Sequence, residues 1–417
     1  MAQLTDDCFA FSGPLLPLEE MERLIQERVS QIAGTETVAL HGAAGRVLAA
    51  DIVAPLDLPP FDNSAVDGYA VRHGDLASGT ETRLVVSGRV MAGHQARGLA
   101  PGEAVRIFTG APMPEGADTV FMQEDCRAEG NAVILPTGLK LGANRRLAGE
   151  DVKAGSVVLP AGRLLSVADV GLAAALGLTA IQVRRRVRVA LFSTGDEIVE
   201  PGAARPPSAL YDANRFLLAG LLARLGAQVT DLGIVADDPA ALKAAIGKAA
   251  KSHDLVLTSG GVSTGEADHV RAAVEDIGSL VFWRVAIKPG RPVAMGVVGG
   301  AAFVGLPGNP VAAFVTFVRV VRPLLLRLGG ASPRPLVPLP VRAAFSYRKK
   351  KGRREYVRVA LRPAADGGVE AVKHPQEGAG VITSLTETDG LAELPDDVTE
   401  IEPGAVVGFL SYATLVG

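Results

Sequence analysis

The sequence contains few of the residues that build disulfide frameworks, zinc sites and membrane spans. Only two of its 417 residues are cysteines, Cys8 and Cys126, which excludes a disulfide framework and predicts a reducing, cytoplasmic location. The six histidines lack the spacing of zinc ligands. The most apolar stretch, 311–326, is interrupted by two arginines and a proline, and is shorter than the roughly 20 apolar residues that cross a bilayer. The first residues, MAQLTDDCFAF, lack the basic start of a signal peptide, so we expect neither export nor a membrane partner.

The sequence also lacks a strong charge of either sign. Its 42 Lys and Arg residues against 45 Asp and Glu residues give a net charge of −3, which argues against a dedicated nucleic-acid partner. One basic run, 348–354 (RKKKGRR), stands apart. The residues alone leave open whether this run attracts nucleic acid or an anionic small molecule.

The chain has ample material for packed cores, because 48% of its residues are hydrophobic. Its length predicts two to four domains at roughly 150 residues each. Residues 15–33 carry apolar side chains at helical spacing and predict an amphipathic helix. Residues 36–185 are rich in Gly and Pro with short apolar runs, which predicts small β-structures, with one short helix at 166–178 that Ser166 caps.

Strand-like and helix-like segments alternate between about 186 and 330. The strands are expected at 187–192, 227–234, 254–258 and 301–306. Asn214 is a possible cap for the helix after the first strand, and Asp237-Asp238-Pro239 opens the next helix. This alternation predicts a doubly wound, largely parallel sheet.

A proline-rich linker is expected at 331–340 (ASPRPLVPLP), and it is the clearest domain boundary in the chain. Beyond it, apolar runs at 356–361 and 405–410 alternate with turn residues. They predict a small C-terminal β-domain.

Ligands of an open α/β sheet bind at the carboxyl ends of its strands. The third strand runs into the glycine-rich segment 259–265 (SGGVSTG), whose backbone N–H groups suit a phosphate, although an unliganded turn would look the same. Acidic residues follow the strands at the same edge, and together they predict Mg²⁺ bound by oxygens: Glu197, Asp237, Glu266 and Asp268. Asp238 could equally be only a helix cap.

Basic side chains are offered by 282–293 (FWRVAIKPGRPV), which the prolines predict to be a rigid loop carrying Arg284 and Lys288. A solvated loop is the other interpretation. Two polar strings in the β-rich half contain Asp67 and Thr109, and turn chemistry alone would explain both.

Taken together, several strings resemble the molybdopterin molybdenumtransferase family, which is similar to the E domain of gephyrin. They occur in family order over most of the chain: PPFDNSAVDGYAV (59–71), RIFTGAPMPEGADTV (106–120), GEDVKAG (149–155), LFSTGDEI (191–198), YDANR (211–215), DDP (237–239), SGGVSTGEADHV (259–270), FWRVAIKPGRPV (282–293) and GLPGNPV (305–311).

The resemblance implies a multidomain α/β-plus-β fold. Its parts would be an N-terminal helix (1–35) packing on the α/β domain, a small linking subdomain (36–53 and 156–185), a β-rich lobe (54–155), a molybdopterin-binding α/β domain (186–330) and a C-terminal β-barrel (334–417).

The resemblance also implies the activity. Family members react adenylylated molybdopterin with molybdate to give molybdenum cofactor and AMP, with Mg²⁺. The matching catalytic positions are Asp67, Thr109, Asp151, Glu197 and Lys288, and the metal positions are Glu197, Asp237 and Asp268. The matching cofactor-binding positions are Ser259, Gly260, Gly261, Ser263, Asp268, Arg284, Pro307, Pro310 and Arg358. The implied partners are a second copy of the chain, a molybdopterin adenylyltransferase and molybdoenzyme maturation factors, with a site shared across the homodimer.

The chain departs from the family pattern in two places. Arg284 stands where the family often has Lys, and Ala379 stands in a Gly-Ser-Gly-like turn where a hydroxyl would help to hold molybdate. Two alternatives stay open at this stage. One is a molybdopterin adenylyltransferase, which needs only the α/β domain, and the other is a gephyrin-like dimeric scaffold.

Overall fold

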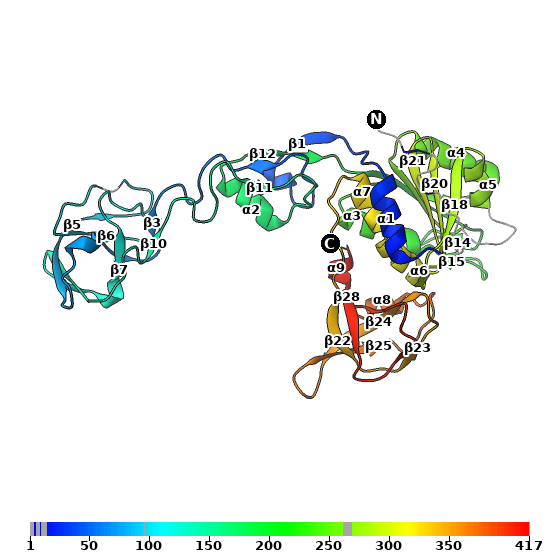
Figure 1. Ribbon diagram of the computed structural model, residues 1–417. Coiled ribbons are helices and arrows are strands. Elements are labelled where there is room, and N and C mark those ends of the chain that lie inside the picture. The colour runs from blue at the N-terminus through cyan, green and yellow to red at the C-terminus, as the bar shows by residue number, and fades with distance from the viewer. Residues whose placement is uncertain (1–3, 6–8, 10–14, 96, 262–268, 417) are drawn as a thin grey trace. The chain divides into compact units, whose positions relative to one another are not determined.

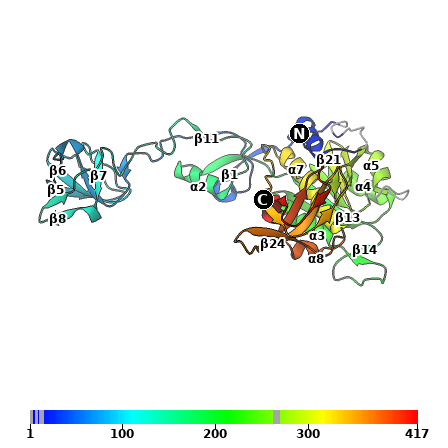
Figure 2. The same ribbon diagram turned by 60° about the horizontal axis from the view of Figure 1, so that its bottom comes forward.

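The computed structural model describes residues 4–5, 9, 15–95, 97–261 and 269–416. The chain divides into two compact units, which Figures 1 and 2 show from two directions. One unit contains Met1–Ala49, Ala161–Ser166 and Ile181–Gly417, and the other contains Ala50–Pro160 and Val167–Ala180. No helix in the described ranges is long and apolar enough to cross a membrane.

The first unit is built around a six-stranded sheet, which confirms the predicted doubly wound, largely parallel sheet. Its order is β16 (Gln228–Val235), β13 (Arg188–Thr194), β17 (Leu255–Ser259), β21 (Ala301–Leu306), β20 (Pro292–Val298) and β18 (Gly278–Arg284). The first four strands are parallel, and β20 and β18 are antiparallel to their neighbours.

Both faces of this sheet are covered by helices. Along β13, Val189 and Leu191 face a core shared with α3 (Asn214–Arg224), whereas Ala190 and Phe192 face a core shared with α4 (Pro239–Ala250) and α5 (His269–Glu275). A strand buried on both faces needs apolar residues at successive positions, which is why 189–192 (VALF) is a continuous apolar run. As predicted, Asp238 caps α4, and its carboxylate accepts a hydrogen bond from the backbone of Ala241 at 2.8 Å.

The prediction of a loop over 282–293 was wrong for most of its length. Its ends belong to β18 and β20, which pair antiparallel, and Ile287–Lys288 forms the short strand β19. The prolines misled the prediction, because Pro292 stands at the first residue of its strand, where a missing N–H is tolerated.

The predicted helix over 311–327 is a continuous helical segment of three parts. It consists of α6 (Pro310–Thr316), a π-helical turn η4 (Phe317–Val321) and α7 (Arg322–Leu328). The predicted N-terminal helix is α1 (Leu18–Arg28). Its residues Met21, Leu24 and Ile25 join the core that β13 shares with α3. The backbone N–H of Ile32 donates to the carbonyl of Leu328 at 3.2 Å, so the residues after α1 contact the end of α7.

The predicted C-terminal β-barrel is confirmed. Its five strands close on themselves because β24 pairs with both β25 and β26. The strands are β22 (Leu339–Ala343), β24 (Arg354–Pro363), β25 (Val369–Lys373), β26 (Gly390–Leu394) and β28 (Val406–Ser411), coloured orange to red in Figure 1. Strand β19 of the α/β domain pairs parallel with β24, which joins the barrel to that domain.

The second unit holds a six-stranded curled sheet. Its order is β7 (Thr119–Met122), β4 (Gly68–Val71), β6 (Glu103–Ile107), β5 (Thr82–Val90), β9 (Ala132–Leu135) and β8 (Arg127–Glu129). The same unit contains α2 (Val167–Ala175), which matches the predicted short helix. The finer division of this half into a lobe and a linking subdomain stays a prediction.

Short elements complete the chain. The paired short strands are β1 (Thr35–Ala39) with β12 (Ala180–Arg184), β2 (Ile52–Val53) with β11 (Val157–Leu159), β3 (Asn63–Ser64) with β10 (Arg145–Arg146), β14 (Ile198–Val199) with β15 (Leu210–Tyr211), and β23 (Tyr347–Arg348) with β27 (Glu400–Ile401). The short helices are η1 (Leu40–Gly42), η2 (His73–Asp75), η3 (Gln123–Asp125), α8 (Thr383–Thr386) and α9 (Tyr412–Val416).

Candidate functional site

A cavity of about 520 Å³ opens at the carboxyl ends of β13, β17 and β21. This is the edge where ligands of open α/β sheets bind. The cavity is lined by residues from all three strand ends, from the start of α3 and from the barrel: Ser193, Thr194, Glu197, Ile198, Leu210, Tyr211, Asp212, Ala213, Asn214, Ser259, Gly260, Gly308, Asn309, Pro310, Gly380 and Ile382.

The glycine at the end of β17 is required by a close approach of two strand ends. Gly260 has φ of +90°, and a Cβ there would lie 2.4 Å from the carbonyl oxygen of Thr194. Its backbone N–H donates to the carbonyl of Leu306 at 3.1 Å, so β13, β17 and β21 converge at this residue. Gly261 also has a positive φ, of +67°. The predicted glycine-rich turn is therefore confirmed up to Gly261, and Ser263 lies outside the described residues.

Asn214 was predicted to cap α3, and that prediction was wrong. Asn214 is the first residue of the helix, and its side chain makes no capping hydrogen bond. Its amide instead donates to the hydroxyl of Ser259 at 2.8 Å and to the carbonyl of Gly308 at 2.7 Å. Because Asn214 is buried, these bonds tie the β17 loop to the β21 loop across the floor of the cavity.

Arg215 fixes the start of α3 from the other side. This buried arginine donates to Asp212 at 2.9 Å and also pairs with Asp231 and Glu200. Asp212 is itself buried and lines the cavity. Sequence reasoning missed Asn214 and Asp212 as site-forming residues, and the signal available was the YDANR string, which places two buried polar side chains within three positions.

One hydroxyl in the wall of the cavity has no hydrogen-bond partner among the residues that the structure describes. Ser193 is only 1% exposed, and within the described ranges no group bonds its Oγ. A buried polar atom without a partner is costly, and such atoms mark places where a ligand or water completes the hydrogen bonding.

The predicted carboxylates are only partly brought together. Glu197 lines the cavity, is exposed, and folds back over Gly195. Asp237 lies behind Thr194, whose hydroxyl donates to its Oδ1 at 3.5 Å. Asp268, like Glu266, lies outside the described residues. Over the ranges that the structure covers, no group of three His, Cys, Asp or Glu side chains is placed to hold a metal ion.

The barrel supplies one wall of the cavity through Gly380 and Ile382. The backbone of this loop is held by Arg358, which donates to the carbonyls of Gln376 and Gly378 and to the hydroxyl of Ser384. Burial lowers the pKa of Arg358 from its ordinary value. Arg358 therefore organises the loop rather than lining the cavity itself.

Lys288 lies at the junction of the α/β domain with the barrel. Its ammonium donates to Glu355 at 3.1 Å and to the Tyr347 hydroxyl at 3.2 Å. Burial by itself raises the pKa of Glu355, but hydrogen bonds from Tyr347, Lys288 and Arg353 outweigh it and hold that pKa below its usual value. Lys288 is nevertheless exposed. Arg284, the last residue of β18, is also exposed.

Asp67 and Thr109 come together in the second unit. Both the backbone N–H and the hydroxyl of Thr109 donate to Oδ1 of Asp67 at 2.8 Å, and they lower the pKa of Asp67 below its usual value. Asp151 is exposed in the same unit.

In the first unit, Pro310 begins α6 and lines the cavity, and Pro307 directly follows β21.

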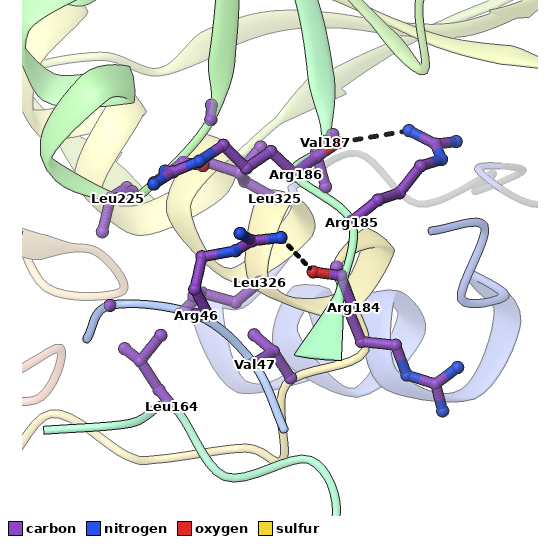
Figure 3. Close-up of a pocket in the computed structure, with 14 residues that line it drawn as sticks. Arg46, Val47, Leu164, Arg184, Arg185, Arg186, Val187, Leu225, Leu325 and Leu326 are labelled. Carbon is purple, nitrogen blue, oxygen red and sulfur yellow. Dashed lines mark hydrogen bonds between the residues drawn. The ribbon is translucent and has the colours of Figure 1, made fainter. Parts of the chain in front are cut away.

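A second, much smaller pocket at the opposite end of β13 is rich in arginine, as Figure 3 shows. Its volume is about 30 Å³, and three of its four arginines already have partners. Arg46 pairs with Glu36 and donates to the carbonyl of Arg184, Arg185 pairs with Asp254, and Arg186 donates to the carbonyl of Gly226. This pocket is structural.

Family models match nearly the whole chain. The MoeA N-terminal region (domain I and II) matches residues 16–177, a probable molybdopterin binding domain matches 190–327, and the MoeA C-terminal region (domain IV) matches 340–412. A curated molybdopterin molybdenumtransferase of Haemophilus influenzae is 37% identical over 406 residues, which cover 97% of this chain and 100% of the relative. The chain belongs to the molybdopterin molybdenumtransferase family.

Further members of this family support the match. A molybdopterin molybdenumtransferase of Nostoc is 39% identical over 89% of this chain and 87% of its own length. The crystal structure of the molybdopterin biosynthesis MoeA protein of Pyrococcus horikoshii has a TM-score of 0.80 at 30% identity, and it covers 95% of this chain and 100% of that one. The family resemblance inferred from the motifs is therefore confirmed.

Proposed function

We propose that this molybdenumtransferase-family chain inserts molybdate into adenylylated molybdopterin and releases AMP. The observation that supports it best is the 520 Å³ cavity, whose floor is tied together by Asn214 and whose wall holds the unpartnered hydroxyl of Ser193. Its size suits a small organic substrate. The backbone around Gly260 can approach a phosphate closely, because no side chain stands there.

The chemistry needs positioning and charge neutralisation more than a covalent nucleophile. Ser259 and Gly260 would hold the substrate phosphates at the end of β17. Lys288, oriented by Glu355, would attract the molybdate dianion. Arg358 would fix the barrel loop against which the substrate lies.

We further propose that Glu197 and Asp237, with Asp268, hold Mg²⁺. Carboxylate oxygens are the ligands that this hard cation prefers, and the Thr194 hydroxyl beside Asp237 adds an oxygen of the same kind. When bound, Mg²⁺ would neutralise charge on the phosphates of the substrate.

We also propose that the active form is a homodimer with a site shared between chains, in which Asp67 and Thr109 of one chain act with Glu197 and Asp237 of the other. The hydrogen bonds from Thr109 support this role, because they keep Asp67 ionised and oriented.

The test is AMP release from adenylylated molybdopterin with Mg²⁺, with and without molybdate. The proposal expects AMP release that needs molybdate and stops when EDTA removes the metal. A parallel reaction with molybdopterin and MgATP tests for adenylyltransferase activity. Turnover in that reaction, with none in the first, would overturn the proposal.

A further inference from the structure

Another cavity of the first unit lies between α1, the η4–α7 segment and the proline-rich stretch 331–336. Its volume is about 350 Å³, and α1 and α7 lie side by side along it (Figure 1). Its apolar walls are Val318, Pro323, Leu326, Pro333, Pro335 and Leu336. The charged residues of the lining are four arginines and one acid: Arg23, Arg319, Arg322, Arg334 and Glu22. It shares no lining residue with the substrate cavity.

The two inner arginines come from an irregular part of the helix. Arg319 belongs to the π-helical turn and Arg322 begins α7, so the two are three residues apart and face the same cavity. π-helical turns inside α-helices cost hydrogen-bond geometry and occur frequently at functional sites. Here the irregular turn presents two cations to one cavity.

These cations are poorly compensated. Arg319 is 7% exposed and donates to Glu22 at 2.9 Å, but its buried Nε has no partner. Within the described part of the chain no side-chain hydrogen bond or ion pair involves Arg322; the residue is half-buried, and its Nε is buried without a partner. Burial, and then the neighbouring Arg319 cation, lower the pKa of Arg322 from its ordinary value.

An uncompensated cation away from water destabilises a fold, and an apolar residue of similar size in its place often stabilises it. Positions that break a local rule of stability in this way are expected at functional sites. The guanidinium groups of Arg319 and Arg322 are planar donors that suit bidentate contacts with phosphate or carboxylate. The apolar walls around them suit the body of an organic molecule.

We propose that this cavity is a second ligand site, which binds an organic anion with an apolar body and one phosphate or carboxylate group. Arg322 and Arg319 bind the anionic group, and the apolar walls enclose the body. The site is independent of the molybdate reaction, so it can stand or fall separately from the proposed function.

The experiment is isothermal titration calorimetry of the full-length protein with phenyl phosphate, benzoate and benzyl alcohol. Phenyl phosphate or benzoate should bind saturably, the better of the two identifies the anionic group, and neutral benzyl alcohol should not bind. Arg322→Met should weaken this binding about 10- to 150-fold, the value of one charge-assisted hydrogen bond. If phenyl phosphate also enters the substrate cavity, Arg322→Met should show one binding site fewer per chain than the natural protein.

Two further readouts separate a ligand site from a structural role. Arg322→Met should not lower the melting temperature of the ligand-free protein, because the half-buried guanidinium that it removes has a buried Nε without a partner. Arg322→Lys should keep the charge but bind more weakly than the natural residue, since Lys cannot form the bidentate contact. Arg348→Met, on the exposed surface of the barrel, is the charge-matched control and should change nothing. The proposal is overturned if neither phenyl phosphate nor benzoate binds saturably. It is also overturned if the anion binds Arg322→Met as tightly as it binds the natural protein.

Discussion

The amide nitrogen of Asn214 lies 2.8 Å from the hydroxyl of Ser259, and this contact joins the start of α3 to the end of β17. The same amide reaches the carbonyl of Gly308 in the loop after β21. One buried side chain thus sets the spacing of the segments that surround the candidate substrate cavity.

Asn214→Ala should therefore damage both stability and activity. It leaves the Ser259 hydroxyl and the Gly308 carbonyl without their donor, which costs about 1–3 kcal/mol of unfolding free energy. The KM for adenylylated molybdopterin should rise, because the two loops lose their fixed spacing. Urea unfolding and AMP release measure the two effects. Asn131→Ala, at an exposed turn of the other unit, is the control and should behave like the natural protein. A fully stable and active Asn214→Ala variant would show that the contact does not set the site.

Gly260→Ala should be more harmful than Gly308→Ala, although both glycines line the same cavity. A methyl group at Gly260 meets the carbonyl oxygen of Thr194 at 2.4 Å and forces a non-glycine residue to φ of +90°, whereas nothing lies within 4 Å at Gly308. Backbone strain alone costs about 1–3 kcal/mol. Thermal melts of the two variants give the comparison, and equal melting temperatures would contradict the close approach of β13 and β17.

The sequence predicted the sheet and the barrel because their patterns are local. The run 189–192 is apolar at every position because both of its faces are buried, and Asp238-Pro239 marks the helix start that the structure shows. The role of Asn214 could not be predicted in this way. Its partner Ser259 is 45 residues away, and an asparagine at a helix start is usually a cap. Likewise, the hydrogen bonds that Arg358 makes to the 376–384 loop depend on how the barrel closes, which no local pattern records.

Lys288→Ala should raise the molybdate concentration for half-maximal AMP release about 10- to 150-fold, with binding of the pterin substrate less affected. The reason is the loss of a cation that Glu355 and Tyr347 hold in place. Lys373→Ala is a close control, because its ammonium also lies over the Tyr347 ring but pairs with Glu377 instead. An equal loss of pterin binding and molybdate dependence in Lys288→Ala would make Lys288 a phosphate contact instead.

Asp254 should make the protein sensitive to acid. Burial by itself raises the pKa of Asp254, but hydrogen bonds from Arg185 and Arg188 outweigh it, so the pKa of the folded state lies below the usual value. A lowered pKa stabilises the fold above the unfolded-state pKa, about 3.9, and this contribution is lost as the pH falls through the folded-state pKa.

The measurement is urea unfolding between pH 7 and pH 3. The natural protein should lose stability as the pH drops below about 4. Asp254→Asn should be less stable at pH 7 by about 1–3 kcal/mol and should show a shallower acid dependence. Asp125→Asn, at an exposed position of the other unit, is the control. Parallel acid curves for the natural protein and Asp254→Asn would rule out this carboxylate as the cause.

The shared site proposed for the homodimer predicts complementation. Asp67→Ala and Asp268→Ala chains should each be inactive, and mixed dimers should recover part of the activity, because one of their two sites keeps both natural residues. AMP release is measured after the chains are unfolded and refolded together, and differently tagged chains confirm that mixed dimers form. Mixed dimers that stay inactive would place the whole site within one chain.

The central claim is that the cavity at the carboxyl ends of β13, β17 and β21 holds the substrate. The most direct measurement is a crystal structure of the protein with adenylylated molybdopterin. We expect density in the cavity, with a phosphate within hydrogen-bonding distance of the backbone at Ser259 and Gly260 and a new partner for the Ser193 hydroxyl. Substrate density elsewhere on the chain, with this cavity filled only by water, would contradict it.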